Sequence, residues 1–210
     1  MNFDKFLISI SKIKNIPLTA PNSHIKMLPP FRLELIEMNK KAMKHAKRAG
    51  VMALFYPDEN WQTKLVLILR NSYNGVHSAQ ISFPGGKFEE QDISLEKTAI
   101  RETFEEIGIQ KIEVVKQLTD VYIPPSNFYV QPYIGILENT PKFNKQDNEV
   151  QEIIEVFLHD FMNDASIINT LVETSYLIKV QVPAYKLNNH IVWGATAMIL
   201  SEIKDLLKKV

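Results

Sequence analysis

Carboxylate side chains crowd into a short stretch that begins at a pair of glycines. The glycines are Gly85 and Gly86, and the acidic residues that follow include Asp92, Glu102, Glu105 and Glu106. Carboxylates this close together repel one another, and a hard cation with oxygen ligands removes that repulsion. The pattern therefore predicts a site that holds Mg²⁺ or Mn²⁺ against a phosphate.

The spacing of the three glutamates predicts that they share one face of a helix. The stretch from Ser94 to Ile107 lacks proline, begins beside residues typical of a helix start, and is followed by Gly108, typical of a helix end. At about 100° per residue, the glutamates fall within an arc of about 100°. The apolar residues expected to pack on the opposite side are Ile100, Phe104 and Ile107.

Two further expectations follow from the same helical geometry. Arg101 and Glu105 are four residues apart, so an ion pair between them would hold the carboxylate face in one arrangement. Leu95 and Ala99 project on the carboxylate side, where we expect the glycine turn to cover them.

The alternative for this segment is a solvated acidic face, which is the commonest fate of a charge run. Lys97 and Arg101 would then simply balance the glutamates, and the two glycines would form an unrelated turn. The strand-like residues 79–83 lead directly into the glycine turn, and the helix follows at short range. This coupling favours the metal site.

The same residues resemble the signature of the Nudix hydrolase family. The first half of the match is Gly86 followed, after five residues, by the acid Asp92, where the family usually has Glu. The second half consists of Arg101-Glu102, Glu105-Glu106 and Gly108-Ile109. Thr103 stands in a slot that is usually apolar, and one additional residue separates the two halves.

The longer spacing that this additional residue creates resembles that of the coenzyme A pyrophosphatase branch of the family. The branch also carries an arginine at a strand end and a His-x-Gly-Gln-x-x-Phe-Pro-Gly-Gly stretch. Here Arg70 ends an apolar run, and residues 77–86 match that stretch with Ala79 in place of the first glycine, while Gly75 stands where a second arginine is frequent. Segments 124–133 and 191–197 resemble later parts of the same branch.

The resemblance implies an α/β Nudix fold with a mixed β-sheet sandwiched between α-helices. It also implies a metal-dependent hydrolase that cleaves the pyrophosphate bond of coenzyme A or its derivatives. The products would be 3′-phosphoadenosine 5′-phosphate and (acyl-)phosphopantetheine. The alternatives are a Nudix hydrolase of another nucleoside diphosphate derivative, such as ADP-ribose, NADH or a dinucleotide, and a Nudix-fold binding module without turnover.

The expected metal ligands come from the acidic helix and the glycine turn. A metal ion can both neutralise phosphate oxygens and deliver a deprotonated water. Glu102 and Glu106 are the expected principal ligands, and Glu105 is expected to bind directly or through water. A carbonyl of Gly85 or Gly86 would complete the shell.

Other residues are candidates for catalysis and substrate binding. Arg101 is expected to orient carboxylates, and Glu149 and Glu152 are candidates for the general base, with ordinary loop charge as their alternative. The candidates for substrate binding are Arg70, His77, Phe128 and Trp193. His77 would either donate a hydrogen bond to a phosphate or have a structural role. The aromatic residues would stack on adenine, line the pantetheine path, or pack in the core.

Composition fits one compact enzyme domain. With 210 residues and 45% apolar content, the chain can bury a substantial core. Its 24 basic and 24 acidic residues give a formal net charge of zero, so no overall positive charge attracts the protein to nucleic acid or to an anionic membrane. The absence of cysteine excludes disulfides and thiolate sites. We therefore expect a cytoplasmic enzyme with a small nucleotide substrate, and no nucleic-acid or membrane partner.

Residues 1–50 are expected to form a helical extension and linker packed on a Nudix domain at residues 51–210. Apolar residues at helical spacing near the start are Phe3, Phe6, Leu7 and Ile10. The run is too short to span a bilayer and is poorly flanked for a signal peptide. We expect it to pack on its own domain or on a second subunit, which leaves a homodimer open, rather than on a membrane.

The rest of the pattern predicts strands flanked by helices. Residues 17–30 form a proline-rich linker, residues 31–48 a helix, and residues 194–208 a second helix. The first helix carries a basic stripe, expected to be a solvated face, made of Lys40, Lys41, Lys44, Lys47 and Arg48. The expected strands are 51–56, 65–70, 113–122, 130–137, 152–158 and 175–182.

Overall fold

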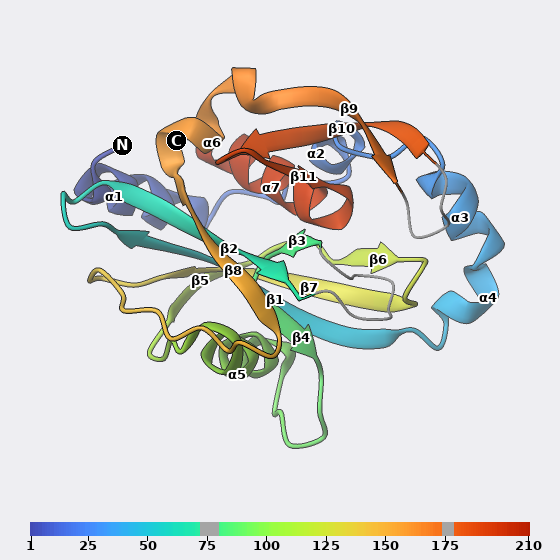
Figure 1. Cartoon of the computed structure of the whole chain (residues 1–210), viewed down its shortest axis with the longest axis horizontal. Helices are drawn as coiled ribbons and strands as arrows, with labels where there is room; N and C mark the ends of the chain where they lie inside the picture. The colour runs from blue at the N-terminus through green and yellow to red at the C-terminus, as the bar shows by residue number, and fades with distance from the viewer. Residues whose placement is uncertain (72–79, 174–178) are drawn as a thin grey trace.

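The structure, a computed structural model, describes residues 1–71, 80–173 and 179–210. Within these residues, eight strands form one mixed sheet and three form a smaller antiparallel sheet (Figure 1). The large sheet is built around β1 (Lys47–Pro57), which pairs in parallel with β7 (Phe128–Ile136). This long parallel ladder is the frame on which the glycine turn and the acidic helix are mounted.

The other strands of the large sheet pair with β1, β2 or β7. On one side, β2 (Thr63–Arg70) pairs antiparallel with β1, with β8 (Val150–Phe157) and with β3 (Ile81–Ser82). The short strand β4 (Gly85–Lys87) pairs with β1 at Ala49–Val51. On the other side, β5 (Glu113–Gln117) and β6 (Val121–Ile123) pair with β7.

Both faces of the large sheet are buried, because successive side chains of its central strands enter two different cores. In β1, Ala53 and Phe55 join one apolar cluster, whereas Met52 and Leu54 join the other. The first cluster includes α1 (Phe3–Ile13), α7 (Gly194–Leu207) and the small sheet, and the second includes α5 (Leu95–Ile107). Figure 1 shows α5 below the sheet and the other elements above it. The expected sandwich is confirmed.

The N-terminal segment packs on the large sheet of its own chain. In α1, Asn2 caps the helix by accepting from the Asp4 N–H, and Phe6 packs on Phe55 with ring centroids 4.9 Å apart. The next helices are α2 (Asn22–Ile25), α3 (Arg32–Met38) and α4 (Lys40–Met43). The α2 segment is tied to α7, where Ser201 donates to the Ser23 carbonyl at 2.7 Å. These contacts set the path along which the chain reaches α3.

The small sheet leads into the last helix. It consists of β9 (Ile167–Glu173), β10 (Lys179–Leu187) and β11 (His190–Trp193), and β11 runs directly into α7. A short helix α6 (Leu158–Met162) and a 3₁₀ turn (Asp164–Ser166) connect it to β8. In the described parts of the chain, no helix is long and apolar enough to cross a membrane.

Three element predictions were wrong in part. The single helix expected over residues 31–48 is two short helices, α3 and α4, which meet at Asn39. The second ends at Met43, because Lys47 and Arg48 already pair with Phe128 and Tyr129 in the parallel ladder. The single strand expected at 113–122 is two strands, β5 and β6. The strand expected at 175–182 begins outside the described residues, and β9 and β11 were not predicted.

Candidate active site

The glycine turn lets β1, β4 and α5 approach one another at backbone distance. A Cβ at Gly86 would lie 2.4 Å from the Glu102 carboxylate, and one at Gly50 would lie 2.2 Å from the Leu95 carbonyl oxygen. Gly85 has φ +146°, and a Cβ at this position would lie 2.4 Å from the Gly50 carbonyl oxygen. Side chains at these positions would push the helix off the sheet. The glycines therefore place the carboxylates of α5 directly beside the turn.

The packing of α5 differs from the expected division into a carboxylate face and an apolar face. Phe104 was expected to be buried, but it is 45% exposed. The buried residues are Thr98, Ala99, Thr103, Glu106 and Ile107. Ala99 and Leu95 pack in the apolar cluster that includes Met52 and Leu54 of β1, and their backbone lies against Gly50, which pairs with Gly86 of the turn. The close approach of the helix to β1 therefore draws one glutamate, Glu106, into the buried face.

Glu106 is fully buried and is held by two donors. Its Oε1 accepts from Arg70 Nη1, and its Oε2 accepts from the Gly85 N–H, each at 2.8 Å. Burial raises the pKa of Glu106 to about 7, against the lowering effects of the Arg70 charge and the Gly85 N–H. Arg70, predicted as a substrate contact, thus forms an ion pair with a predicted metal ligand.

Arg101 joins three carboxylates. Its Nε and Nη2 donate to the two oxygens of Asp92, both at 2.9 Å, and its Nη1 donates to Glu102 at 3.0 Å and to Glu105 at 2.9 Å. The expected pairing with Glu105 is present, but the bidentate partner is Asp92. The Arg101 hydrogen bonds hold the pKa of Asp92 well below its usual range. Arg101 therefore fixes the carboxylates while its own position is fixed by Asp92.

Two other glutamates of the helix, Glu102 and Glu105, differ in exposure. The Glu102 side chain is 14% exposed, and burial raises its pKa, although Arg101 opposes the shift. The charges of Glu105 and Glu149 raise it further. The Glu105 side chain is 51% exposed. The site therefore combines one buried, one nearly buried and one solvent-facing carboxylate.

The structure separates the two candidates for the general base. Glu149 is exposed, and its charge raises the pKa of both Glu102 and Glu106, so it stands near the carboxylate set. Glu152 lies instead against His190, with the Nε2–Oε1 distance at 3.4 Å. The charge of Glu149 therefore acts on the carboxylates of α5, whereas the contact recorded for Glu152 is with His190.

The carboxylates of α5 are suitable ligands for a hard divalent cation. Across the described residues, no three His, Cys, Asp or Glu side chains already stand close enough to form a metal cage. The Glu102 charge nevertheless raises the pKa of Glu106, and a cation between them would remove that repulsion. Glu102, Glu105 and Glu106 offer carboxylate oxygens, which are the ligands that Mg²⁺ and Mn²⁺ prefer.

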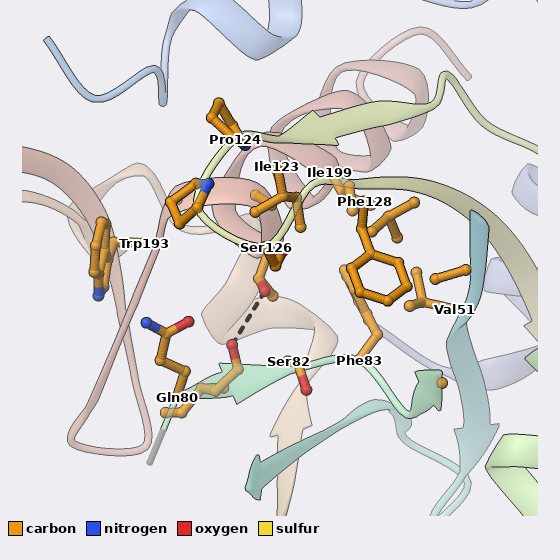
Figure 2. A pocket seen from close by; sticks show the side chains of 18 of the residues that line it. Val51, Gln80, Ser82, Phe83, Ile123, Pro124, Ser126, Phe128, Trp193 and Ile199 are labelled. Carbon is orange, nitrogen blue, oxygen red and sulfur yellow. Dashed lines mark hydrogen bonds between the residues drawn. The ribbon is translucent and has the colours of Figure 1, made fainter. Parts of the chain in front are cut away.

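A cavity of about 370 Å³ opens at the glycine turn. Phe128 and Trp193, both predicted to contact substrate, line it, and Figure 2 shows them at different sides of the pocket with Ser126 between. The cationic residues of its wall are Arg32, Arg70 and Lys87, and its described lining residues include no Asp or Glu. The cavity is therefore suited to an anionic ligand with apolar parts. His77 lies outside the described residues.

Three residues of this region were not singled out from the sequence. Arg32 reaches the cavity from α3, a segment predicted only as part of a helix in the extension. Ser82 and Ser126 line it from β3 and from the turn after β6. Nothing in the local pattern marks them, because their roles depend on which distant elements the fold brings together.

The comparisons with known proteins agree with this geometry. The family model described as the NUDIX domain matches residues 46–169, beginning next to β1. The chain belongs to the Nudix family. It is similar to the Nudix hydrolase NudL of Photorhabdus laumondii, with 30% identity over 175 residues that cover 82% of this chain and 91% of that protein.

Two further relatives are longer proteins. Nudix hydrolase 15, mitochondrial, of Arabidopsis thaliana is 33% identical over 161 residues, which cover 73% of this chain and 56% of that protein. The peroxisomal coenzyme A diphosphatase ndx-8 of Caenorhabditis elegans is 27% identical over 135 residues, which cover 63% of this chain and 58% of that protein. The match thus spans little more than half the length of either relative.

Solved structures support the fold. The Nudix hydrolase RenU of M. smegmatis superposes with a TM-score of 0.53 and 13% identity, covering 79% of this chain and 88% of that chain. At this level of identity the likeness concerns the fold alone.

Proposed function

We propose that this protein is a divalent-metal-dependent hydrolase that cleaves the pyrophosphate bond of coenzyme A or its derivatives. The products are 3′-phosphoadenosine 5′-phosphate and (acyl-)phosphopantetheine. One observation carries the proposal: a cavity with three cationic and many apolar lining residues opens at the glycine turn, where the carboxylates of α5 lie. The cavity wall attracts a polyanion, and the adjoining carboxylates suit a metal ion that would act on it.

The metal would be held by Glu102 and Glu106, with Glu105 binding directly or through water and a Gly86 carbonyl completing the shell. A bound Mg²⁺ or Mn²⁺ would neutralise phosphate oxygens and lower the pKa of a bound water. Arg101 holds two of these carboxylates in place through the hydrogen bonds described above. The ligands are thus oriented from outside the metal site.

Glu149 is our candidate for the general base. It is exposed, and its charge raises the pKa values of Glu102 and Glu106. The Glu149 carboxylate could therefore accept a proton from an attacking water bound near those ligands. Glu152, paired with His190, is the second candidate.

Two sequence similarities support coenzyme A as the substrate. One is the additional residue between the halves of the signature, which resembles the coenzyme A branch. The other is the relative named as a coenzyme A diphosphatase. Phe128 and Trp193 offer aromatic walls for adenine or for the pantetheine arm. A cytoplasmic location and a homodimer stay predictions from the sequence.

A substrate panel tests the proposal. We expect coenzyme A to be hydrolysed with a higher kcat/KM than ADP-ribose, NADH or diadenosine polyphosphates, in the presence of Mg²⁺ or Mn²⁺. Efficient turnover of another compound while coenzyme A is spared would refute the substrate but leave the class of reaction standing. Binding of these compounds without turnover of any, with either metal, would favour the binding module.

A further inference from the structure

Arg32, a residue of the N-terminal extension, lines the cavity. It is the first residue of α3, and it is only 6% exposed. Its Nη2 donates to the backbone carbonyl of Tyr122, the middle residue of β6. This contact fixes the guanidinium beside the turn that contributes Pro124, Pro125 and Ser126 to the cavity wall.

The charge of Arg32 has no acidic partner in the described parts of the chain. The other arginine of the cavity wall, Arg70, is paired with Glu106. Among the residues that the structure describes, no carboxylate pairs with Arg32, and its Nε has no hydrogen-bond partner. Burial lowers the pKa of Arg32 to about 10, so the guanidinium still carries its charge at neutral pH. A buried cation of this kind costs free energy unless an anion compensates it.

Two serine hydroxyls in the same cavity also lack hydrogen-bond partners within residues 1–71, 80–173 and 179–210. Ser82 Oγ and Ser126 Oγ are buried, line the cavity, and make no hydrogen bond among the described residues. Figure 2 shows Ser82 on the side of Phe83 and Ser126 on the side of Pro124. Hydroxyl and guanidinium donors together match the oxygens of a phosphate, and a guanidinium binds phosphate with two parallel hydrogen bonds.

We propose that Arg32, assisted by Ser126, binds a phosphate monoester of the substrate that is distinct from the pyrophosphate being cleaved. On coenzyme A, this group is the 3′-phosphate of the ribose. The pyrophosphate belongs at the glycine turn, where Arg70 and Lys87 line the cavity, whereas Arg32 enters from α3, which Figure 1 shows well apart from β4. The inference rests on the proposed function, because it assigns one end of the proposed substrate.

The test compares coenzyme A with dephospho-coenzyme A, which lacks the 3′-phosphate. We expect Arg32→Gln to lower kcat/KM for coenzyme A by about 10- to 100-fold, mainly through KM, as one charge-assisted interaction would. The same variant keeps its kcat/KM for dephospho-coenzyme A. Arg32→Lys recovers part of the loss, and Ser126→Ala gives a smaller loss with the same selectivity. Arg48→Gln is the matched control, since Arg48 is exposed and lies outside the cavity wall.

Equal losses on both substrates would overturn the assignment, because they would mean that Arg32 contacts a shared group or supports the fold. A binding measurement separates this failure from failure of the proposed function. We expect calorimetry to show that the wild-type protein binds adenosine 3′,5′-bisphosphate more tightly than AMP, and that Arg32→Gln removes the difference. If the wild type hydrolyses neither substrate but keeps this difference, only the proposed function fails. If it binds both nucleotides equally, the Arg32 assignment fails whatever the turnover.

Discussion

Arg70 donates to Glu106 at 2.8 Å, joining the end of strand β2 to the buried face of the acidic helix. The same carboxylate also accepts from the Gly85 N–H. Three elements of the site, β2, the glycine turn and α5, therefore meet at one side chain. This side chain is not the surface carboxylate that a solvent-facing acidic helix would present.

Breaking this pair from one side should destabilise the protein more than removing both charges. Arg70→Met removes the cation that favours the ionised form of Glu106, so the pKa of Glu106 should rise further and the free energy of unfolding should fall by about 1–3 kcal/mol at neutral pH. Arg70→Met combined with Glu106→Gln should recover part of that loss. Urea denaturation of the two single variants and the double variant measures the coupling. Strict additivity would contradict the pairing.

Gly86→Ala should damage activity by displacing a carboxylate. The new Cβ would lie 2.4 Å from the Glu102 carboxyl group, so that group must move by about an ångström or more. Misplacement on this scale costs on the order of 100-fold in rate. Steady-state kinetics, alongside thermal unfolding to verify the fold, checks the expectation. A folded variant with unchanged kcat would show that Glu102 takes no part in the reaction.

The exposed glutamate of the helix gives the cleanest test of metal binding. We expect Glu105→Gln to raise the Mg²⁺ or Mn²⁺ concentration needed for half-maximal activity by about 10-fold, without changing stability by more than about 0.5 kcal/mol. Glu138→Gln is the matched control, because Glu138 is also exposed and lies outside the site. Activity titrated with each metal is the measurement. Identical titrations for the two variants would remove Glu105 from the ligand set.

The Asp92–Arg101 pair predicts a pH-dependent difference in stability. Arg101 lowers the pKa of Asp92 in the folded state, so the stabilisation is complete above the unfolded pKa of about 3.9 and is lost as the pH falls below it. Asp92→Asn should therefore lower stability by about 1–3 kcal/mol at pH 7.

The difference in stability between the wild type and the Asp92→Asn variant should shrink progressively as the pH falls below about 4, because the folded-state pKa of Asp92 lies well below its unfolded value. Thermal or urea unfolding between pH 2 and pH 7 follows this decrease. A difference that is the same at every pH would mean that packing, not charge, links Asp92 to Arg101.

The acidic helix could be predicted well from the sequence because its signals are local. Ser94 caps it through the Lys97 N–H, and Gly108 ends it at φ +76°, as the sequence indicated. The face that it buries could not be predicted from periodicity alone. That face is set by the absence of a side chain at Gly50, far away in the sequence.

The cavity depended on long-range pairings that no local pattern reports. Arg32 meets the Tyr122 carbonyl across 90 positions of sequence separation, and Lys47 adopts a strand because β7 pairs with it. Candidates such as Phe128 and Trp193 were identified through the resemblance to a known branch of the family. Residues of the N-terminal extension lay outside that resemblance, so Arg32 was found only in the structure.

The most direct test of the central claim is the identification of the products formed from coenzyme A in the presence of Mn²⁺. Mass spectrometry should detect 3′-phosphoadenosine 5′-phosphate and phosphopantetheine in equal amounts with the wild type, and neither product above background with Glu102→Gln. Unchanged coenzyme A with the wild type, or equal product formation by both proteins, would contradict a pyrophosphate hydrolase centred on the carboxylates of α5.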